Sequence, residues 1–313
     1  MSSNSTLGVC IPTYKRPDQL TACVQSIIAS AGASGVPIYI SDDSADDTNV
    51  EAVESLREAY PNIIHERNAQ NLGIDCNILR SVDICRCRYA WLMGEDDHMK
   101  PDAIPVILDI IEKDTDRWPF IYVNYASVDA SFTRVLKKRS LELHADVERG
   151  AEDFLKREAW SMGFIGACVI QKSSWAKVRK EPYVGTYFAH VGAIMEYLYG
   201  RGVRLVAEPL VLNRCSSPDA FSWKKSTFEV LGGWERLMNI MKPLYGAEVC
   251  DESLKSFERA HGLNSVKFLC YARSGGALDR SVYGLHIRNG NYSVGYKIAA
   301  MVVPNLREAV VTA

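Results

Sequence analysis

The sequence predicts an α/β fold built around a mostly parallel sheet. Short apolar runs, such as residues 7–11, 36–40 and 89–93, alternate with segments whose apolar side chains recur at helical spacing. Strands that alternate with helices are typical of parallel sheets with crossover connections. In such sheets ligands bind beyond the carboxyl ends of the strands, where the chain order reverses. Polar side chains that directly follow strands are therefore the first candidates for function.

Each element of the first half rests on a local pattern. Leu7 to Ile11 is an apolar run that we expect to end at Pro12, because proline has no backbone N–H to donate. Helices are expected where apolar side chains recur every three or four residues, and Asp18 can cap the first of them. In chain order, we expect strands at 7–11, 36–40, 63–66, 89–93 and 120–124, and helices at 18–29, 48–60, 75–85 and 101–113.

The second half is less regular. Small residues lead into an expected strand at 163–170, followed by a helix at 187–199 and a strand at 203–207. Helical patterns dominate from about residue 224. We therefore divide the chain into an α/β domain, residues 1–223, and a helical C-terminal region, residues 224–313. For that region we expect docking on the domain, contact with another subunit of a homo-oligomer, or contact with a membrane surface.

Composition narrows the possible functions. A formal net charge of −2 over 313 residues argues against a general nucleic-acid-binding protein, which would be basic. The polar N-terminus lacks the layout of a signal peptide, and no apolar stretch approaches the roughly 20 residues that span a bilayer. The nine cysteines stand largely in apolar contexts and are expected to be reduced. We expect a cytoplasmic protein, with peripheral contact at the inner face of the plasma membrane as one possibility.

Three adjacent carboxylates end the apolar run at residues 89–93. Glu95, Asp96 and Asp97 repel one another where solvent is partly excluded, and a cation relieves that repulsion. A divalent cation prefers oxygen ligands, and a phosphate-bearing substrate can complete its coordination. A solvated acidic turn before the helix at 101–113 is the plainer alternative. The run indicates a metal-dependent enzyme acting on a nucleotide or a phosphorylated compound.

Four segments, in the expected order, resemble the motifs of glycosyltransferase family 2, whose members have the GT-A fold. Residues 10–17 resemble the opening strand and loop of the family, and residues 40–48 resemble its aspartate-rich turn. Asn71-Leu72-Gly73 resembles its asparagine–glycine segment, and residues 94–97 take the place of its DxD motif. The resemblance covers roughly residues 7–215 and implies a Rossmann-like sheet flanked by helices, in a 1–223 catalytic domain.

The resemblance also implies roles for individual residues. Asp97, with Glu95, would ligate Mn²⁺ or Mg²⁺, which bridges the donor diphosphate. Asp42 would meet the base and ribose, while Arg16 reaches phosphate or remains a surface charge. The full set expected around the nucleotide sugar is Pro12, Thr13, Tyr14, Arg16, Asp42, Asp43, Asn71, Gly73, Glu95, Asp96 and Arg214.

The acceptor side departs from the common family pattern. Many members carry Glu-Asp at the start of a helix here, and the aspartate acts as the general base. In this sequence His190 falls at that place, with Glu196 as the reserve candidate, and a helix-packing histidine is the alternative. This segment and residues 94–97 also resemble abequosyltransferases and related enzymes that transfer deoxyhexoses to lipopolysaccharide, a looser similarity.

The resulting interpretation is an inverting glycosyltransferase of bacterial surface polysaccharide or lipopolysaccharide synthesis. Its donor would be a UDP-, CDP-, GDP- or dTDP-linked sugar, and its acceptor a saccharide or a lipid-linked saccharide. A sugar-phosphate nucleotidyltransferase is a second possibility, although residues 12–16 lack the expected glycine-rich phosphate loop. A nucleotide-binding protein with a decayed transferase site is a third.

Overall fold

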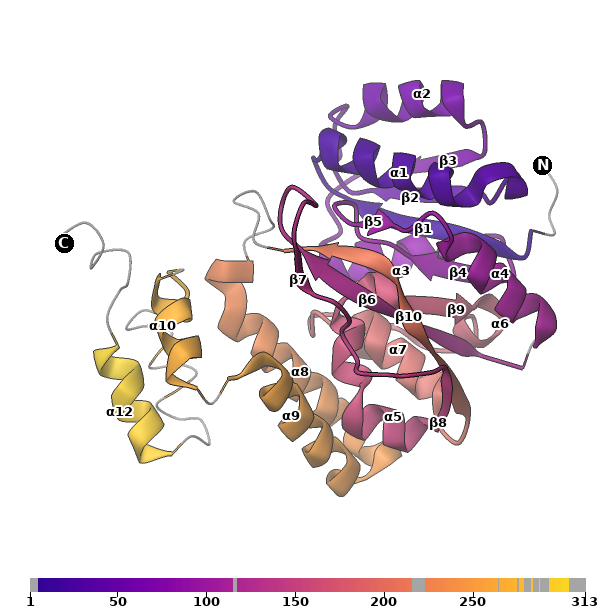
Figure 1. The fold of residues 1–313 in the computed structure, drawn as a ribbon. Helices are drawn as coiled ribbons and strands as arrows, with labels where there is room; N and C mark the ends of the chain where they lie inside the picture. Colours follow the sequence, from indigo (N-terminus) through magenta and orange to yellow (C-terminus); the bar gives the residue numbers. More distant parts are fainter. Residues whose placement is uncertain are drawn as a thin grey trace.

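A ten-stranded sheet forms the centre of the computed structural model (Figure 1). The structure describes residues 5–114, 117–215, 223–263, 265–274, 276–278, 283, 287 and 293–303. The strands follow the order β3-β2-β1-β4-β9-β6-β10-β5, with β7 paired to β6 and β8 to β10. Strands β3, β2, β1 and β4 run parallel, as do β6 and β10, whereas β9 is antiparallel to both of its neighbours. The prediction of an α/β fold with a central sheet flanked by helices is confirmed, but the sheet is mixed rather than mostly parallel, because five of its nine strand pairs are antiparallel.

The first half of the chain alternates strand and helix as the sequence predicts, with shifted bounds. Its elements are β1 (Leu7–Thr13), α1 (Pro17–Ala31), β2 (Ile38–Asp42), α2 (Val50–Ala59), β3 (Ile63–Arg67), α3 (Ile74–Asp83), β4 (Tyr89–Leu92), β5 (His98–Met99), α4 (Ala103–Lys113) and β6 (Phe120–Val128).

The second half departs more from expectation. Its elements are β7 (Val135–Lys137), β8 (Val147–Gly150), α5 (Ala151–Arg157), β9 (Cys168–Gln171), α6 (Lys172–Trp175), α7 (Ala189–Leu198), β10 (Gly202–Arg214), α8 (Trp223–Tyr245), α9 (Ala247–His261), α10 (Val266–Ser274) and α12 (Val294–Val302).

Two expectations about strand bounds are wrong. Strand β1 does not end at Pro12 but runs through it to Thr13, in register with Ser41 and Asp42 of β2. The strand expected at 163–170 begins only at Cys168, because residues 159–167 form two 3₁₀ turns. Strands β5, β7 and β8 and helix α5 were not predicted, since two to seven residues carry too little periodicity to be recognised.

The main hydrophobic core extends past residue 223. Its members include Trp234 of α8 and Phe257 of α9, whose rings stack with centroids 4.9 Å apart. At Gly233 a Cβ atom would lie 1.9 Å from the carbonyl oxygen of Thr186, so only glycine lets α8 approach that closely. A separate, smaller core joins Phe228 to α10 and α12, which project away from the sheet in Figure 1. The division at residue 223 stays a prediction.

Candidate active site at the carboxyl ends of the strands

Loops that follow β1, β2 and β4 are tied together by hydrogen bonds at one edge of the sheet. The backbone N–H of Tyr14 donates to Glu95 Oε2 at 2.9 Å, and that of Lys15 donates to Ser44 Oγ at 3.0 Å. Asn77 Nδ2, on α3, donates to the carbonyl oxygen of Thr13 at 3.2 Å. The expectation that these motifs share one edge is therefore confirmed, as parallel strand order requires.

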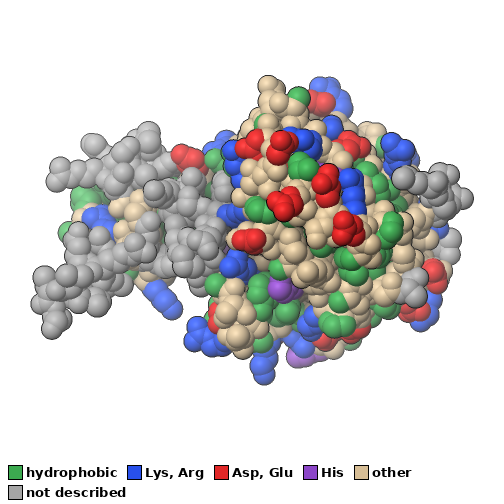
Figure 2. Space-filling view, turned by 90° about the horizontal axis from the view of Figure 1, so that it is seen from above, with side chains coloured by type: hydrophobic (Ala, Val, Ile, Leu, Met, Phe, Trp, Pro, Cys, Tyr) green, Lys and Arg blue, Asp and Glu red, His purple; other side chains and the backbone are tan. Residues whose placement is uncertain are grey.

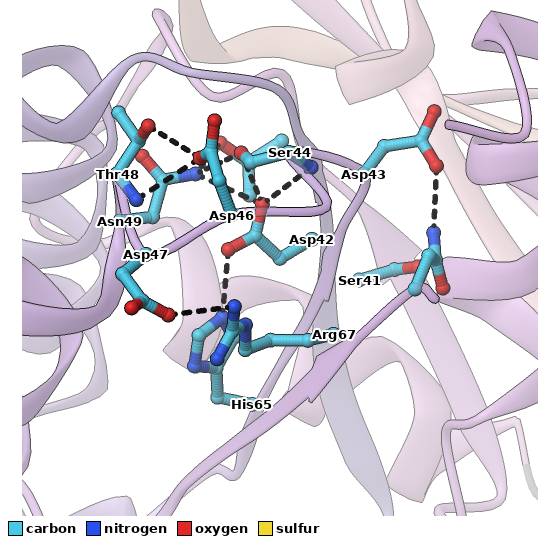
Figure 3. A network of polar contacts seen from close by, with 12 residues as sticks. Ser41, Asp42, Asp43, Ser44, Asp46, Asp47, Thr48, Asn49, His65 and Arg67 are labelled. Carbon is cyan, nitrogen blue, oxygen red and sulfur yellow. Dashed lines mark hydrogen bonds and ion pairs between the residues drawn. The ribbon is translucent and has the colours of Figure 1, made fainter. Parts of the chain in front are cut away.

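Asp42 lies at the centre of a buried polar network (Figure 3). Its Oδ1 accepts from the backbone and hydroxyl of Ser44, at 3.0 and 2.5 Å, and from Asn49 Nδ2 at 3.0 Å. Its Oδ2 lies 3.0 Å from His65 Nε2. Burial alone would raise the pKa of Asp42, but the hydrogen bonds outweigh it and the pKa falls below its usual value. Both oxygens of this carboxylate already have protein partners.

Asp43 points away from the Asp42 network and shapes the next loop (Figure 3). Its Oδ1 accepts from Asn68 Nδ2 at 2.9 Å and from the N–H of Leu72 at 2.8 Å, and its Oδ2 accepts from the N–H of Gly73 at 3.1 Å. Gly73 has φ +81, which favours glycine, and it is the N-cap residue of α3. Asn71 Oδ1 also accepts from Gly73, at 2.9 Å. Asp43 therefore holds the asparagine–glycine segment in place.

The acidic loop is held between β4 and β5. Strand β5 begins directly after Asp97 and pairs with β10, and the N–H of Arg214 at the end of β10 donates to Asp97 Oδ1 at 2.9 Å. A Cβ atom on Gly94 would lie 2.2 Å from Asp97 Oδ2, so the Asp97 side chain folds back over a residue without one. Glycine at position 94 is therefore a steric requirement for this placement of Asp97.

Glu95 and Asp97 hold unfavourable negative charge. Burial, with a smaller contribution from Asp96, raises the pKa of Glu95 to about 7. Burial also raises the pKa of Asp97 well above its usual range, and repulsion by Asp96 and Glu95 adds to the effect. Carboxylates with such raised pKa values, at the edge of the sheet where ligands bind, are candidates for function. A bound cation would offset the free-energy cost of ionising them.

Arginine side chains border the acidic loop. Arg16 Nη1 lies 3.2 Å from Asp96 Oδ2, and its Nε lies 3.6 Å from Glu95 Oε1. The Nε of Arg214 donates to the carbonyl oxygen of Ala130 at 2.9 Å. Tyr14 is 42% exposed beside them, while Thr13 is buried and Pro12 continues β1. Seen from above, the face of the molecule that carries α2 shows acidic side chains with Lys and Arg between them (Figure 2).

The acidic loop fits a hard divalent cation that draws part of its coordination from a ligand. The buried carboxylate of Asp97 and the partly buried carboxylate of Glu95 both have raised pKa values and are suitable oxygen donors. Within the described ranges, no cluster of three or more His, Cys, Asp or Glu side chains is arranged to hold a metal. A cation here would therefore take its remaining ligands from phosphate and water, as Mg²⁺ commonly does.

His190, the candidate base, lies in the first turn of α7 and is 1% exposed. Its Nε2 lies 2.9 Å from the carbonyl oxygen of Met162, which can only accept, so Nε2 carries the proton. Nδ1 then presents a lone pair, and among the described residues no group bonds to it. Burial lowers the pKa of His190, against smaller opposing effects of the Met162 carbonyl and Asp75, so the ring is neutral near pH 7.

Glu196, the reserve candidate, lies on α7 and accepts a hydrogen bond from the hydroxyl of Tyr183. It lines a cavity of about 290 Å³ together with Lys177 and Arg201. No contact in the described part of the chain joins Glu196 to residues 94–97. The site roles of His190, Glu196 and the other residues expected around the nucleotide sugar stay predictions.

Three supporting residues escaped sequence reasoning. Asn49 is fully buried and bridges Asp42 and Ser44, while His65 pairs with Asp42 from the neighbouring strand. Asp75 accepts from the N–H groups of three residues around the start of α7, Gly185, Tyr187 and Ala189. No local signal marks His65, which lies in the middle of β3, and Asn49 and Asp75 resemble ordinary helix starts.

The mixed sheet, flanked by helices and with acidic loops at its carboxyl edge, is an architecture of the GT-A type. Residues 8–162, about half of the chain, match the family model described as glycosyl transferase family 2. The abequosyltransferase RfbV of Salmonella typhimurium is 25% identical over 297 residues, which cover 88% of each chain. Residues 8–162 of the chain therefore belong to glycosyl transferase family 2.

Solved structures with low sequence identity share the fold. A structure of S. aureus TarS in complex with UDP-GlcNAc superposes with a TM-score of 0.60 at 12% identity, over 90% of this chain and 83% of that one. The mannosyltransferase PcManGT of Pyrobaculum calidifontis, in complex with GDP-Man and Mn²⁺, gives a TM-score of 0.52 at 14% identity, over 97% and 88% of the two chains. These similarities show that the α/β architecture is of the GT-A type.

Proposed function

We propose that this protein is a metal-dependent glycosyltransferase that moves a sugar from a nucleotide donor to a hydroxyl acceptor. The observation that carries the proposal is a pair of carboxylates at the carboxyl edge of the sheet, the buried Asp97 and the partly buried Glu95, whose pKa values are both raised. They would hold Mn²⁺ or Mg²⁺, which would stabilise the charge on the departing nucleoside diphosphate. The Mn²⁺ in the Pyrobaculum mannosyltransferase supports this choice of cation.

The loops around the carboxylates would hold the nucleotide. Exposed Tyr14 offers an aromatic wall, and the backbone of residues 71–73, fixed by Asp43, offers a second one. Arg16 is paired with Glu95 and Asp96, and it could turn to the diphosphate when a cation neutralises those carboxylates. Arg214, whose backbone N–H donates to Asp97, would be a second positive charge for the diphosphate.

The reaction would invert the anomeric centre in a single displacement, with His190 as the base that removes the acceptor proton. The lone pair of Nδ1 and the lowered pKa support this role, because a base must be unprotonated near pH 7. The 1% exposure of the ring requires a local opening before an acceptor could reach it. The similarity to an abequosyltransferase supports a deoxyhexose or hexose donor and a role in bacterial surface polysaccharide or lipopolysaccharide synthesis.

A donor-hydrolysis screen tests the proposed activity. UDP-, CDP-, GDP- and dTDP-linked sugars are each incubated with the protein, with Mn²⁺ or with EDTA, and release of nucleoside diphosphate is measured. One nucleotide is expected to give turnover only with metal, and to raise the melting temperature under the same conditions. Turnover unaffected by EDTA would refute the metal dependence. A stability gain without turnover, with acceptors also supplied, would indicate a nucleotide-binding protein instead.

The base assignment needs its own comparison. His190→Gln and Glu196→Gln are matched polar changes on one helix, and both are measured for transfer and for donor hydrolysis. We expect the first to lower transfer by about 100-fold, within the usual range for a general base, and the second to leave it nearly unchanged. Loss only in Glu196→Gln would reverse the assignment.

A further inference from the structure

Helix α12 has apolar side chains on opposite faces, and only one of these faces is covered. Tyr296 and Ala300 are buried in the small C-terminal core, beside Leu269 of α10. Val294 and Val302 are 74% and 71% exposed, and Ile298 and Met301 are exposed on the same helix. We call Val294, Ile298, Met301 and Val302 the outer face of α12.

The outer face is continuous. Its members follow one another at intervals of four, three and one residues, which places them on one stripe of a helix. Lys297 borders the stripe and is partly exposed. Water-soluble monomers rarely leave several large apolar side chains side by side on the surface, because each exposed methylene costs about 0.8 kcal/mol relative to burial. This arrangement therefore points to a binding partner with an apolar surface.

The charge of the C-terminal segment indicates which partner the outer face of α12 binds. The last 52 residues carry six Lys and Arg against two Asp and Glu, whereas the whole chain has a net charge of −2. Arg273 of α10 donates to the carbonyl oxygen of Ala300 at 2.7 Å, so one basic side chain of α10 lies at the end of α12. An apolar helix face within a basic segment is complementary to an anionic lipid surface. A second copy of this chain, docked through the same face, would bring the same positive charge against it.

We propose that α12 binds the surface of anionic membranes by laying its outer face into the headgroup region. The helix has nine residues, and none of the helices described is long and apolar enough to cross a bilayer. Contact is therefore peripheral, reversible and weakened by salt. Because α12 lies far from the sheet in Figure 1, this contact leaves the carboxyl edge of the sheet open.

Vesicle co-sedimentation of the full chain tests the proposal. Vesicles of neutral phosphatidylcholine are compared with vesicles containing about 30% phosphatidylglycerol, at about 0.1 M and 0.5 M salt. Binding is expected only to the anionic vesicles and only at low salt. Ile298→Glu with Met301→Glu should lower that binding by about tenfold or more, because two charges would enter the apolar layer.

The control variant is Val135→Glu with Leu136→Glu, which changes two exposed apolar side chains on β7, more than 150 residues before α12 in the sequence. It should bind anionic vesicles as well as wild type does. Val302→Glu, at the end of α12, repeats the test should the double variant unfold. Equal binding by wild type and the α12 variants, or equal binding to neutral vesicles, would overturn the proposal. So would a dimer in light scattering that the α12 changes dissociate while anionic vesicles bind none of the proteins.

Discussion

Two acidic turns follow the strands on either side of β1, β2 and β4, yet their carboxylates are in opposite electrostatic states. Asp42, after β2, has protein partners on both oxygens, and hydrogen bonds lower its pKa despite burial. Glu95 and Asp97, after β4, have raised pKa values because burial outweighs their few partners. The charge of Asp42 is therefore stabilised by the protein itself, whereas the charges of Glu95 and Asp97 would be stabilised by a bound cation.

This difference distinguishes carboxylates that stabilise the fold from carboxylates that bind a ligand. A carboxylate with all its partners inside the protein stabilises the fold, and removing it leaves buried donors without acceptors. A carboxylate kept in a poorly solvated place costs stability until a ligand pairs with it. The four predictions below test that division, in order of their expected effect on turnover.

The largest effect is expected from Asp97→Asn. Asparagine can still accept from Arg214 but brings no charge to a cation, so turnover should fall by about 1000-fold, at the upper end for loss of one electrostatic contact. The melting temperature should stay constant or rise, since the buried charge disappears. Asp96→Asn, whose side chain is 24% exposed, is the control and should lose less than about tenfold. Equal losses in both variants would remove the distinction between the two carboxylates.

Gly94→Ala should have the second largest effect. The added Cβ would meet Asp97 Oδ2 at 2.2 Å, so the carboxylate must move, and turnover should fall by about 10- to 100-fold, as expected for a displaced ligand. Gly150→Ala is the matched control, because a Cβ there meets no atom within 4 Å and φ is −66. Crystals of Gly94→Ala with Asp97 unmoved and full activity would contradict the steric argument.

The sequence could show where acidic groups gather, but not which of them have partners. Motif order placed residues 12–16, 42–43, 71–73 and 94–97 at one edge, because parallel strands end together. The partners of Asp42 come from a different strand and a helix start, His65 and Asn49, and no local pattern links them to it. The hydrogen bond from Arg214 to Asp97 likewise depends on the pairing of β10 with β5, a two-residue strand too short to predict.

Binding of Mn²⁺ should depend on pH through Glu95. Its pKa of about 7 in the folded protein lies above the unfolded value, so the group binds a proton more tightly when folded. Its contribution to stability is therefore lost as pH rises from about 4.5 to 7, and metal must displace that proton below pH 7. We expect Mn²⁺ to bind about tenfold more tightly at pH 8 than at pH 6. Calorimetry measures this, and the dependence should flatten in Glu95→Gln.

Asp42→Asn should change turnover least and stability most. The Ser44 hydroxyl, the Asn49 amide and the His65 imidazole donate to the Asp42 carboxylate, and the NH₂ of asparagine cannot accept from them. At least one buried donor would lose its acceptor, so the free energy of unfolding should fall by about 1–3 kcal/mol. Because the folded pKa of Asp42 is lowered, this stabilisation is present above about pH 4 and is lost as pH falls through the folded pKa, so wild type and variant should converge in acid.

Urea titrations at neutral and acidic pH measure this change, with Asp46→Asn as the control in the same turn, since Asp46 is 45% exposed. Donor KM separates the two possible roles of Asp42. With both oxygens engaged by protein groups, we expect KM to rise less than about threefold, whereas a carboxylate that held base or ribose would cost tenfold or more when neutralised. A large rise in KM at unchanged stability would make Asp42 a ligand-binding group and the Asp42 network part of the nucleotide site.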